Sequence, residues 1–521
     1  MKAALYSQKS DKDTNNIRNR EANLRFFRKF ALRMENKDKD TAFFSKEMPS
    51  PWVSIIPIVV LIAMVSLSIT LFGSDSLGGG NQVALLVATG MCVCLSMMVY
   101  KTPWKVFETH IAETIGSASV SIVILIIIGM LSGAWMISGV VPTLIYYGVQ
   151  IMSPQFFLVS TCAICAIVSL MTGSSWTTIA TIGVALLGIG DALSVPAAWT
   201  AGAIISGAYF GDKISPLSDT TILAASTSGT ELFTHIRYML YTTIPSILIS
   251  LIIFFAAGFW YGNGEVHITE YTQGLENTFN INLWTLIVPL FTAILIAKKV
   301  PSLITLFASS LAAGVCALIL QPDILLEVAK ETDGTTLNYI KGMMITFFTS
   351  TNVDTGNDTL NDLVSTGGMA GMLDTIWLIL CAMCFGGSMV ASKMLQSLTA
   401  VVISFIRNTF GLVASTVCTG LGMNLVTSDQ YISIIISASM YKDVYKKNGY
   451  APELLSRSTE DSATVTSVLI PWNTCGMTQA TVLGVPTLTY LPYCFFNIIS
   501  PIMSCLVAAI GYKIRRIKTT K

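Results

Sequence analysis

Residues 207–221 read Gly207-Ala-Tyr-Phe-Gly-Asp-Lys-Ile-Ser-Pro-Leu-Ser-Asp-Thr-Thr221, which sets carboxylates, hydroxyls and a proline inside hydrophobic sequence of membrane length. A second stretch, residues 460–474, reads Glu460-Asp-Ser-Ala-Thr-Val-Thr-Ser-Val-Leu-Ile-Pro-Trp-Asn-Thr474. A carboxylate at membrane depth costs several kcal/mol, so it usually has a function. Proline breaks a helix and frees backbone carbonyls that a bound cation can satisfy. Two such stretches, one in each half of a membrane protein, are typical of an ion-coupled transporter.

The composition supports a membrane protein. Of 521 residues, 53% are hydrophobic and 12% are charged, about half the charge of a soluble domain. Long apolar runs recur along the chain, and they are too continuous for the alternating strands of a β-barrel. The first of them starts near Trp52, too late for a cleaved signal peptide. We therefore expect an all-α polytopic membrane protein with about 12–14 transmembrane segments, counted from hydrophobic windows.

The two halves of the sequence resemble each other in order. The pieces 52–57 and 284–289 are alike, as are 133–138 and 387–392, and Thr172-Gly173 matches Thr419-Gly420. Pro216 pairs with Pro471, which sets Asp219 opposite Thr474. An ordered set of matches predicts an internal repeat, with broken or re-entrant helices at the polar stretches.

Loop charges predict the orientation of the chain. Residues 1–50 carry 12 Lys and Arg against 7 Asp and Glu, and the C-terminal tail is basic, so both ends are expected in the cytoplasm. The first helices of the two halves then cross in opposite directions, which makes the repeats inverted. The predicted organisation is a basic cytoplasmic segment (1–50), repeat 1 (51–260), an external connection (261–283), repeat 2 (284–512) and a basic cytoplasmic tail (513–521).

Hydroxyl and carboxylate side chains around the two prolines suit a dehydrated Na⁺, which prefers oxygen ligands. Pro216 and Pro471 are expected to open their helices, and Lys213 to neutralise Asp212 when no cation is bound. Thr172-Gly-Ser-Ser175 suits an interrupted helix whose N-terminal amides face the site. A surface loop at 212–221 and a helix N-terminal acidic cluster at Glu460 and Asp461 are the alternatives. The residues expected to bind the ion or substrate are Asp212, Asp219, Ser215, Ser218, Thr220, Thr172, Ser174, Ser175, Asp461, Asn473 and Thr474.

The strings 172–185 and 211–221, supported by 461–476, resemble the NhaC family of Na⁺/H⁺ antiporters. The resemblance spans roughly residues 50–512. It implies a bacterial inner-membrane protein that exchanges cytoplasmic Na⁺ for external H⁺. Some relatives instead couple these ions to organic acids such as malate and lactate, or carry amino acids.

These observations predict a secondary antiporter in which Asp219 is the shared carboxylate, protonated in one half-cycle and bound to Na⁺ in the other. Burial favours the protonated form and a nearby Na⁺ favours the carboxylate, so the two ions compete. Asp212 is expected to bind or gate. Na⁺ and H⁺ are the expected transported ions, the bilayer is the expected surroundings, and no cofactor or nucleic acid is expected. The oligomeric state is open, a homo-oligomer included.

Two rival functions use the same residues. The first is Na⁺- or H⁺-coupled transport of an organic acid or amino acid on the same fold, although no Arg lies within the motifs to hold a carboxylate. The second is an intramembrane aspartyl protease using Asp212, which follows Phe210-Gly211. An inverted repeat rich in hydroxyls has no use in a protease, so a transporter is preferred over an enzyme.

Overall fold

The computed structural model describes residues 48–72, 78–261, 268–298, 300–355, 361, 364–404 and 406–517. The predicted N-terminal segment 1–50 and the end of the tail therefore lie largely outside the described residues. Within those ranges the chain is helical, with only isolated β-bridges. Nine of the described helices are long and apolar enough to cross a membrane, or up to eleven if each of two bent helix pairs is one span. The predicted class, an all-α polytopic membrane protein with broken helices, is confirmed.

The first half begins with three long helices and continues through shorter pieces around the first polar motif. Its elements are α2 (Pro51–Phe72), α3 (Gly80–Tyr100), α4 (Trp104–Ile137), α5 (Val140–Ile151), η2 (Pro154–Phe156), α6 (Phe157–Thr172), α7 (Ser175–Thr178), the π-turn η3 (Ile179–Gly183), α8 (Val184–Ala192), α9 (Ala197–Ile214), α10 (Asp219–Ser228) and α11 (Leu232–Tyr261).

The second half follows a similar order, with two additional helices between residues 322 and 348. Its elements are α12 (Ile268–Thr278), η4 (Leu283–Leu286), α13 (Ile287–Ala297), α14 (Ser302–Leu320), α15 (Pro322–Ala329), α16 (Thr336–Phe348), η5 (Ala370–Met372), α18 (Leu373–Ala391), α19 (Met394–Ser404), α20 (Thr409–Thr427), α21 (Gln430–Lys447), α22 (Pro452–Thr459), the π-turn η6 (Glu460–Thr464), η7 (Ser467–Leu469), α23 (Thr474–Leu483), α24 (Thr487–Tyr490), η8 (Leu491–Tyr493) and α25 (Phe495–Ile510).

The hydrophobic windows near 197–227 and 462–484 are broken at the polar motifs, and the helix after each break is too short to span a bilayer, which takes about 20 residues. α10 and α23 have 10 residues each, because the chain breaks before both of them. Hydropathy windows count such pieces as segments, and this explains the larger number expected from the sequence.

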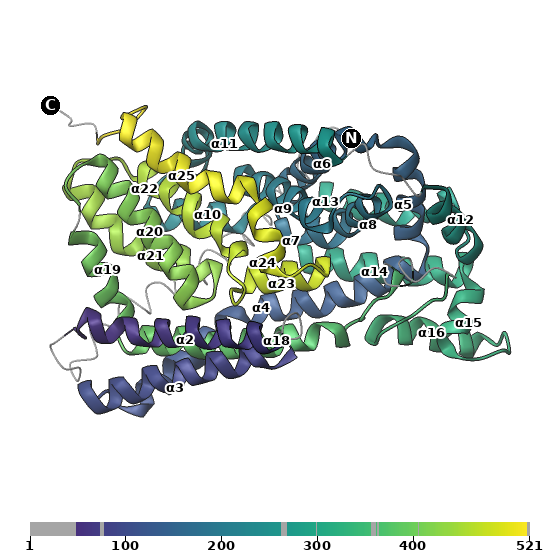
Figure 1. Ribbon diagram of the computed structural model, residues 1–521, viewed down its shortest axis with the longest axis horizontal. Helices are drawn as coiled ribbons and strands as arrows, with labels where there is room; N and C mark the ends of the chain where they lie inside the picture. Colours follow the sequence, from purple (N-terminus) through teal and green to yellow (C-terminus); the bar gives the residue numbers. More distant parts are fainter. Residues whose placement is uncertain are drawn as a thin grey trace, which may run out of the picture.

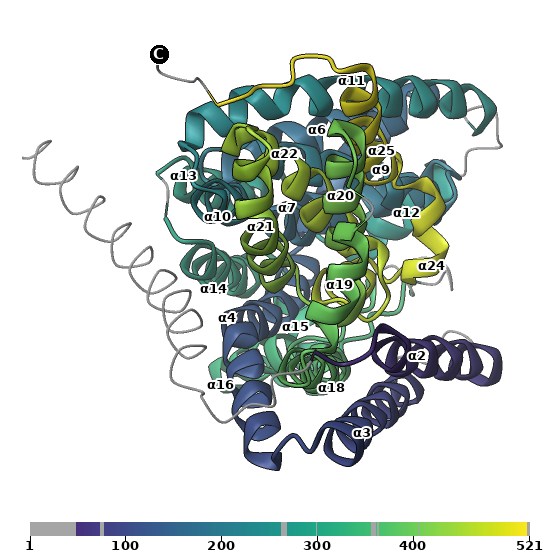
Figure 2. The same ribbon diagram turned by 90° about the vertical axis from the view of Figure 1, so that its left-hand side faces the viewer.

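α2, α3, α4 and α18 pack side by side along the lower part of the molecule (Figure 1). α2 and α3 pack together at one side, away from the broken helices (Figure 2). On α2 the side chains of Trp52, Ile62 and Leu71 are exposed, as expected for a helix that faces lipid.

Equivalent helices of the two halves lie antiparallel. Gly129, in the C-terminal part of α4, packs against Gly368 and Met372 just before α18, and Gly387 near the end of α18 packs against Ile111 near the start of α4. Both helices end alike: Gly139 after α4 and Lys393 after α18 have positive φ, of 79° and 58°. An equivalent pair that runs in opposite directions is the arrangement of inverted repeats.

The described ends of the chain lie at the same end of the molecule. Ser397 of α19 donates a hydrogen bond to the Pro49 carbonyl. The backbone of Arg516 forms an isolated antiparallel β-bridge with the backbone of Tyr450, just before α22. α19, α22 and the end of α25 all lie toward the left in Figure 1, whereas α12, α15 and α16 lie toward the right. Which side of the membrane each end faces stays a prediction.

Candidate ion-binding site

The first helical hairpin turns between α6 and α7. α6 ends at Thr172, Gly173 takes the left-handed conformation with φ 67°, and Ser174 caps α7 by accepting a hydrogen bond from the Thr177 amide at 3.2 Å. The Thr178 hydroxyl donates to the Ser174 carbonyl at 3.0 Å and lies 3.3 Å from the Thr172 hydroxyl. The hairpin tip is therefore fixed by hydroxyl side chains.

The second hairpin, between α20 and α21, repeats this geometry. α20 ends at Thr427, Ser428 is left-handed with φ 57°, and Asp429 caps α21 by accepting from the Ile432 amide at 2.9 Å. The Ser433 hydroxyl donates to the Asp429 carbonyl at 2.7 Å and lies 2.9 Å from the Thr427 hydroxyl. The partner of Thr172 is therefore Thr427, an offset of 255 residues, and not Thr419 as the sequence comparison suggested.

The two helix breaks match as well. Ser218 caps α10, whose first residue is Asp219, and Asn473 caps α23, whose first residue is Thr474. Pro216 and Pro471 lie within these breaks, where each lacks the amide that a continuing helix needs. The structure thus brings Asp219 and Thr474 to equivalent positions, as the sequence predicts.

Each break is tied to the neighbouring hairpin at an equivalent carbonyl. Ser215 donates from its hydroxyl to the Leu170 carbonyl at 2.9 Å, and Trp472 donates from Nε1 to the Leu425 carbonyl at 2.8 Å. Both carbonyls lie in the last turn of a helix, where they lack an intrahelical partner. These bonds satisfy them and hold each hairpin tip against its break.

Asp212 lies in the last turn of α9 and is 6% exposed. Its Oδ2 accepts hydrogen bonds from the Ser175 amide at 3.0 Å and the Ser175 hydroxyl at 2.8 Å. The Ser218 hydroxyl lies beside the same carboxyl group. Its Oδ1 has no hydrogen-bond partner among the described residues. A buried carboxylate oxygen without a partner is an available ligand for a proton or a cation.

Asp219, in contrast, has an exposed side chain at the start of α10. It is close enough to Tyr431 of α21 to interact with it electrostatically, as are Asp212 and Asp429. The surface-loop alternative is wrong for residues 212, 213, 215 and 218, which are buried. Asp219 therefore lies at the accessible edge of an otherwise buried site.

Lys213 does not neutralise Asp212, contrary to the sequence expectation. Its ammonium group makes a buried ion pair with Asp461 of η6, and it donates to the Ser500 hydroxyl at 2.9 Å. Thr242 donates to the same Asp461 oxygen at 3.2 Å. Adjacent residues on a helix point in different directions, so Lys213 and Asp212 face different neighbours. The pair joins the two halves of the chain inside the protein.

Glu460, beside Asp461, is also fully buried. Its Oε1 accepts a hydrogen bond from the Thr220 hydroxyl at 3.2 Å, and Thr220 in turn lies 3.0 Å from the Ser218 hydroxyl. A helix N-terminal acidic cluster is therefore the wrong interpretation of Glu460 and Asp461, because both are buried in η6, which continues directly from α22. Glu460 is linked through Thr220 and Ser218 to the break that holds Asp219.

Two further buried charged residues are absent from the residues that the sequence predicts to bind the ion or substrate. Asp429 is 2% exposed and accepts a hydrogen bond from the Thr474 hydroxyl at 3.4 Å. Arg457 of α22 is fully buried, with its guanidinium 4.7 Å from the centre of the Tyr238 ring. The offset of 255 residues from Ser174 would have found Asp429. Arg457 lies in a short helix of mixed polar and apolar residues, so hydropathy does not indicate that its side chain is buried.

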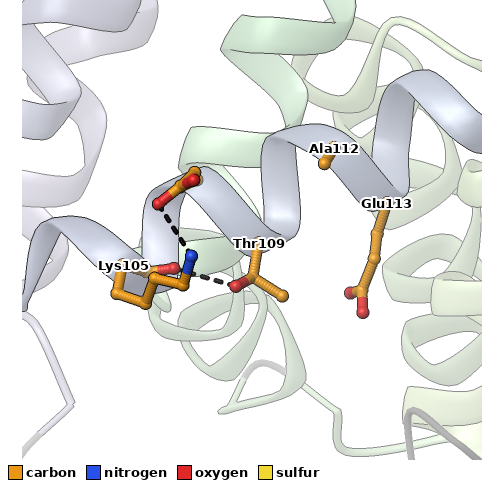
Figure 3. Close-up of a pocket in the computed structure, with 5 residues that line it drawn as sticks. Lys105, Thr109, Ala112 and Glu113 are labelled. Carbon is orange, nitrogen blue, oxygen red and sulfur yellow. Dashed lines mark hydrogen bonds and ion pairs between the residues drawn. The ribbon is translucent and has the colours of Figure 1, made fainter.

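A separate surface hollow lies near the start of α4, lined by Lys105, Glu108, Thr109 and Glu113 (Figure 3). Lys105 and Glu108 form an ion pair of 3.1 Å with largely exposed side chains. An exposed pair of this kind contributes little. The hollow shares no residue with the buried site.

Comparison with known proteins gives the family. The family model described as "Na+/H+ antiporter family" matches residues 207–512, which contain both breaks and the second hairpin. This chain belongs to that family. It is 36% identical to the "Na(+)/H(+) antiporter NhaC" of Bacillus subtilis (strain 168) over 408 residues, 78% of this chain and 87% of that protein.

Other relatives match the chain over a similar length, and one of them is named for a different cargo. The "Na(+)/H(+) antiporter NhaC" of Alkalihalophilus pseudofirmus is 37% identical over 417 residues, 78% of this chain and 86% of the relative. The "Malate-2H(+)/Na(+)-lactate antiporter" of Bacillus subtilis is 33% identical over 456 residues, 87% of this chain and 93% of the relative. The family is one of transporters, which removes the support for a protease.

Proposed function

We propose that this chain is a secondary active antiporter of a bacterial cell membrane that exchanges cytoplasmic Na⁺ for external H⁺. The buried Asp212 carboxylate, with one oxygen bonded to Ser175 and the other without a partner, is the observation that carries the proposal. It is a single group that can hold either a proton or a Na⁺ ion.

The charge balance inside the protein supports this function. Among the described residues, the buried carboxylates are Asp212, Asp429, Glu460 and Asp461, whereas the buried Lys and Arg are Lys213 and Arg457. If every one of these groups is ionised, negative charge is in excess. Uncompensated charge in a protein interior is costly, so the interior needs protons or cations to balance it. Na⁺ and H⁺ can do so interchangeably, which is the requirement for exchange.

Asp212 suits the role of the carboxylate that alternately binds Na⁺ and H⁺ better than Asp219, the residue that the sequence predicts for this role. Competition between a proton and Na⁺ is strongest where water does not screen the carboxylate, and Asp212 is buried while Asp219 is exposed. In the Na⁺ half-cycle Oδ1 of Asp212 and the hydroxyls of Ser175 and Ser218 would supply ligands. In the H⁺ half-cycle Oδ1 would hold the proton. Asp219 would attract Na⁺ at the accessible edge.

Neighbouring groups complete the proposed site. Lys213 is the counter-charge of Asp461, and together they fix α9 against η6 so that Asp212 keeps its position. Pro216 and Pro471 keep the two breaks open. The other ligand residues expected from the sequence line the hairpin tips and breaks: Thr172, Ser174, Ser215 and Thr220 in the first half, and Asn473 and Thr474 in the second half.

The test is proton movement in liposomes that contain the purified protein and an internal pH dye. A Na⁺ pulse should move protons in the wild type, and Asp212→Asn should abolish the response while leaving the protein folded. Asp323→Asn, at an exposed position in the first turn of α15, is the control and should behave like the wild type. Normal exchange by Asp212→Asn would remove Asp212 from the mechanism.

A second candidate function, Na⁺- or H⁺-coupled transport of an organic acid, is favoured by Arg457. All three nitrogens of its buried guanidinium lack a hydrogen-bond partner among the described residues. A guanidinium binds a carboxylate through two parallel hydrogen bonds. Uptake of labelled malate or lactate into the same liposomes, lost in Arg457→Met, would establish this function. No uptake of either acid would leave Na⁺/H⁺ exchange as the function.

A further inference from the structure

We propose that the second repeat holds its own Na⁺ site, formed by Asp429, Thr474 and the turn at Ser428. The proposal rests on the proposed function for the identity of the ion. Its location comes from the structure of the second hairpin and the second break, and it involves neither Asp212 nor Asp219.

The repeat relates the two sites by exchanging an acid and a hydroxyl. At the first hairpin the cap of α7 is Ser174, and the first residue after the break is Asp219. At the second hairpin the cap of α21 is Asp429, and the first residue after the break is Thr474. Each half therefore brings one carboxylate and one hydroxyl to the same pair of backbone positions. In the first half this pair lies beside the proposed Asp212 site, and in the second half the buried carboxylate is itself a member of the pair.

The second site has oxygen ligands at hand. Oδ2 of Asp429 accepts from the Thr474 hydroxyl at 3.4 Å, close to the limit of a hydrogen bond, so this oxygen is only weakly engaged. The Ser428 carbonyl accepts from the Thr474 amide at 2.8 Å, which brings the turn against the start of α23. α20 ends at this turn, and the C-terminal end of a helix is its negative end.

An unsatisfied group marks the same turn. The Ser428 hydroxyl is fully buried and has no hydrogen-bond partner among the described residues. A buried hydroxyl without a protein partner can contact a bound water or ion. This hydroxyl belongs to the residue beside Asp429, in the same turn.

The charges around Asp429 favour a monovalent cation. Its hydrogen bonds come from the Ile432 amide and the Thr474 hydroxyl, which are neutral groups, whereas Asp461 is compensated by Lys213. One carboxylate with hydroxyl and carbonyl oxygens can balance one positive charge. Divalent ions such as Ca²⁺ are usually bound by more than one carboxylate. Na⁺ fits the site in charge and in ligand type.

The experiment counts Na⁺ ions bound by the full-length protein in nanodiscs, using radioactive Na⁺ at equilibrium. The wild type should bind two Na⁺ per chain, and Asp429→Asn should bind one. Thr474→Val should weaken one of the two sites about tenfold, the effect expected for loss of one polar contact. Thr478→Val is the matched control, because Thr478 is a buried threonine one turn later whose hydroxyl bonds the Thr474 carbonyl at 2.6 Å.

The outcomes separate this site from the proposed function. One Na⁺ per chain in both the wild type and Asp429→Asn would overturn the second site and leave exchange at Asp212 intact. Failure of the wild type to exchange Na⁺ for H⁺ in liposomes would overturn the proposed function. If Asp429→Asn does not fold, Thr474→Val decides: two unchanged sites in that variant would contradict the proposal.

Discussion

Lys213 of α9 and Asp461 of η6, which are far apart in the sequence, form an ion pair in which both side chains are fully buried. Ser500 and Thr242 add hydrogen bonds from α25 and α11, so four elements meet at this pair. α9 belongs to the first half of the chain, and η6 belongs to the second. The pair therefore holds the two broken segments together next to the proposed site.

Removing one partner of this pair should be strongly destabilising. Lys213→Met and Asp461→Asn each leave an uncompensated buried charge, which costs about 3–5 kcal/mol. The double variant removes both charges and should be more stable than either single variant, because the two changes are coupled. Thermal unfolding in detergent measures all three. Losses that simply add in the double variant would show that the pair does not act as a unit.

Asp219→Asn should weaken Na⁺/H⁺ exchange without abolishing it. Asp219 is exposed at the edge of the site, so its charge attracts Na⁺ but is screened by water. We expect a several-fold higher Na⁺ concentration for half-maximal exchange, with a nearly unchanged maximal rate. Initial rates of proton movement in liposomes at a series of Na⁺ concentrations measure both quantities. Complete loss of exchange in a folded Asp219→Asn protein would indicate that Asp219, and not Asp212, binds Na⁺ and H⁺ alternately.

Gly173→Ala should disrupt the first hairpin more than Gly484→Ala affects the end of α23. Both glycines have positive φ, of 67° and 64°, so alanine is strained at either position by about 1 kcal/mol. A Cβ on Gly173 would also lie 2.8 Å from the backbone of Leu217 in the first break, whereas a Cβ on Gly484 would meet open space. Gly173→Ala should therefore lower both stability and exchange, and Gly484→Ala stability alone.

Equal effects of the two alanine substitutions would contradict the close contact between hairpin and break. Thermal unfolding and liposome exchange of the two variants, measured side by side, make the comparison. Because both substitutions have the same backbone cost, any difference reports the contact with Leu217.

The sequence predicts the positions of the two helix breaks but not the distant residues that contact them. Pro216 and Pro471 identify the breaks because proline cannot continue a helix, and the cap residues beside them follow from local preferences. Because Lys213 and Asp212 are neighbours in the chain, the sequence suggests that Lys213 neutralises the charge of Asp212. Its true partner, Asp461, lies in the other half, and only the packing of α9 against η6 brings them together.

Burial was equally hard to predict from the sequence. Asp212 and Asp219 share one motif, and nothing local distinguishes the buried acid from the exposed one. Arg457 lies in a short polar helix, and only tertiary packing encloses it beneath Tyr238. The repeat offset of 255 residues aligns Asp429 with Ser174 and so predicts its position at the second hairpin. The match at Thr419-Gly420 implies a different offset, which puts the second hairpin in the wrong register.

The central claim is that Na⁺ and a proton compete for the buried Asp212. Isothermal titration of Na⁺ into the protein in nanodiscs, repeated in buffers with different ionisation heats, measures the protons released as Na⁺ binds. The wild type should release protons, its apparent Na⁺ affinity should rise with pH, and Asp212→Asn should lose that release. Binding of Na⁺ to the wild type with no proton release, at any pH where the protein is folded, would contradict the claim.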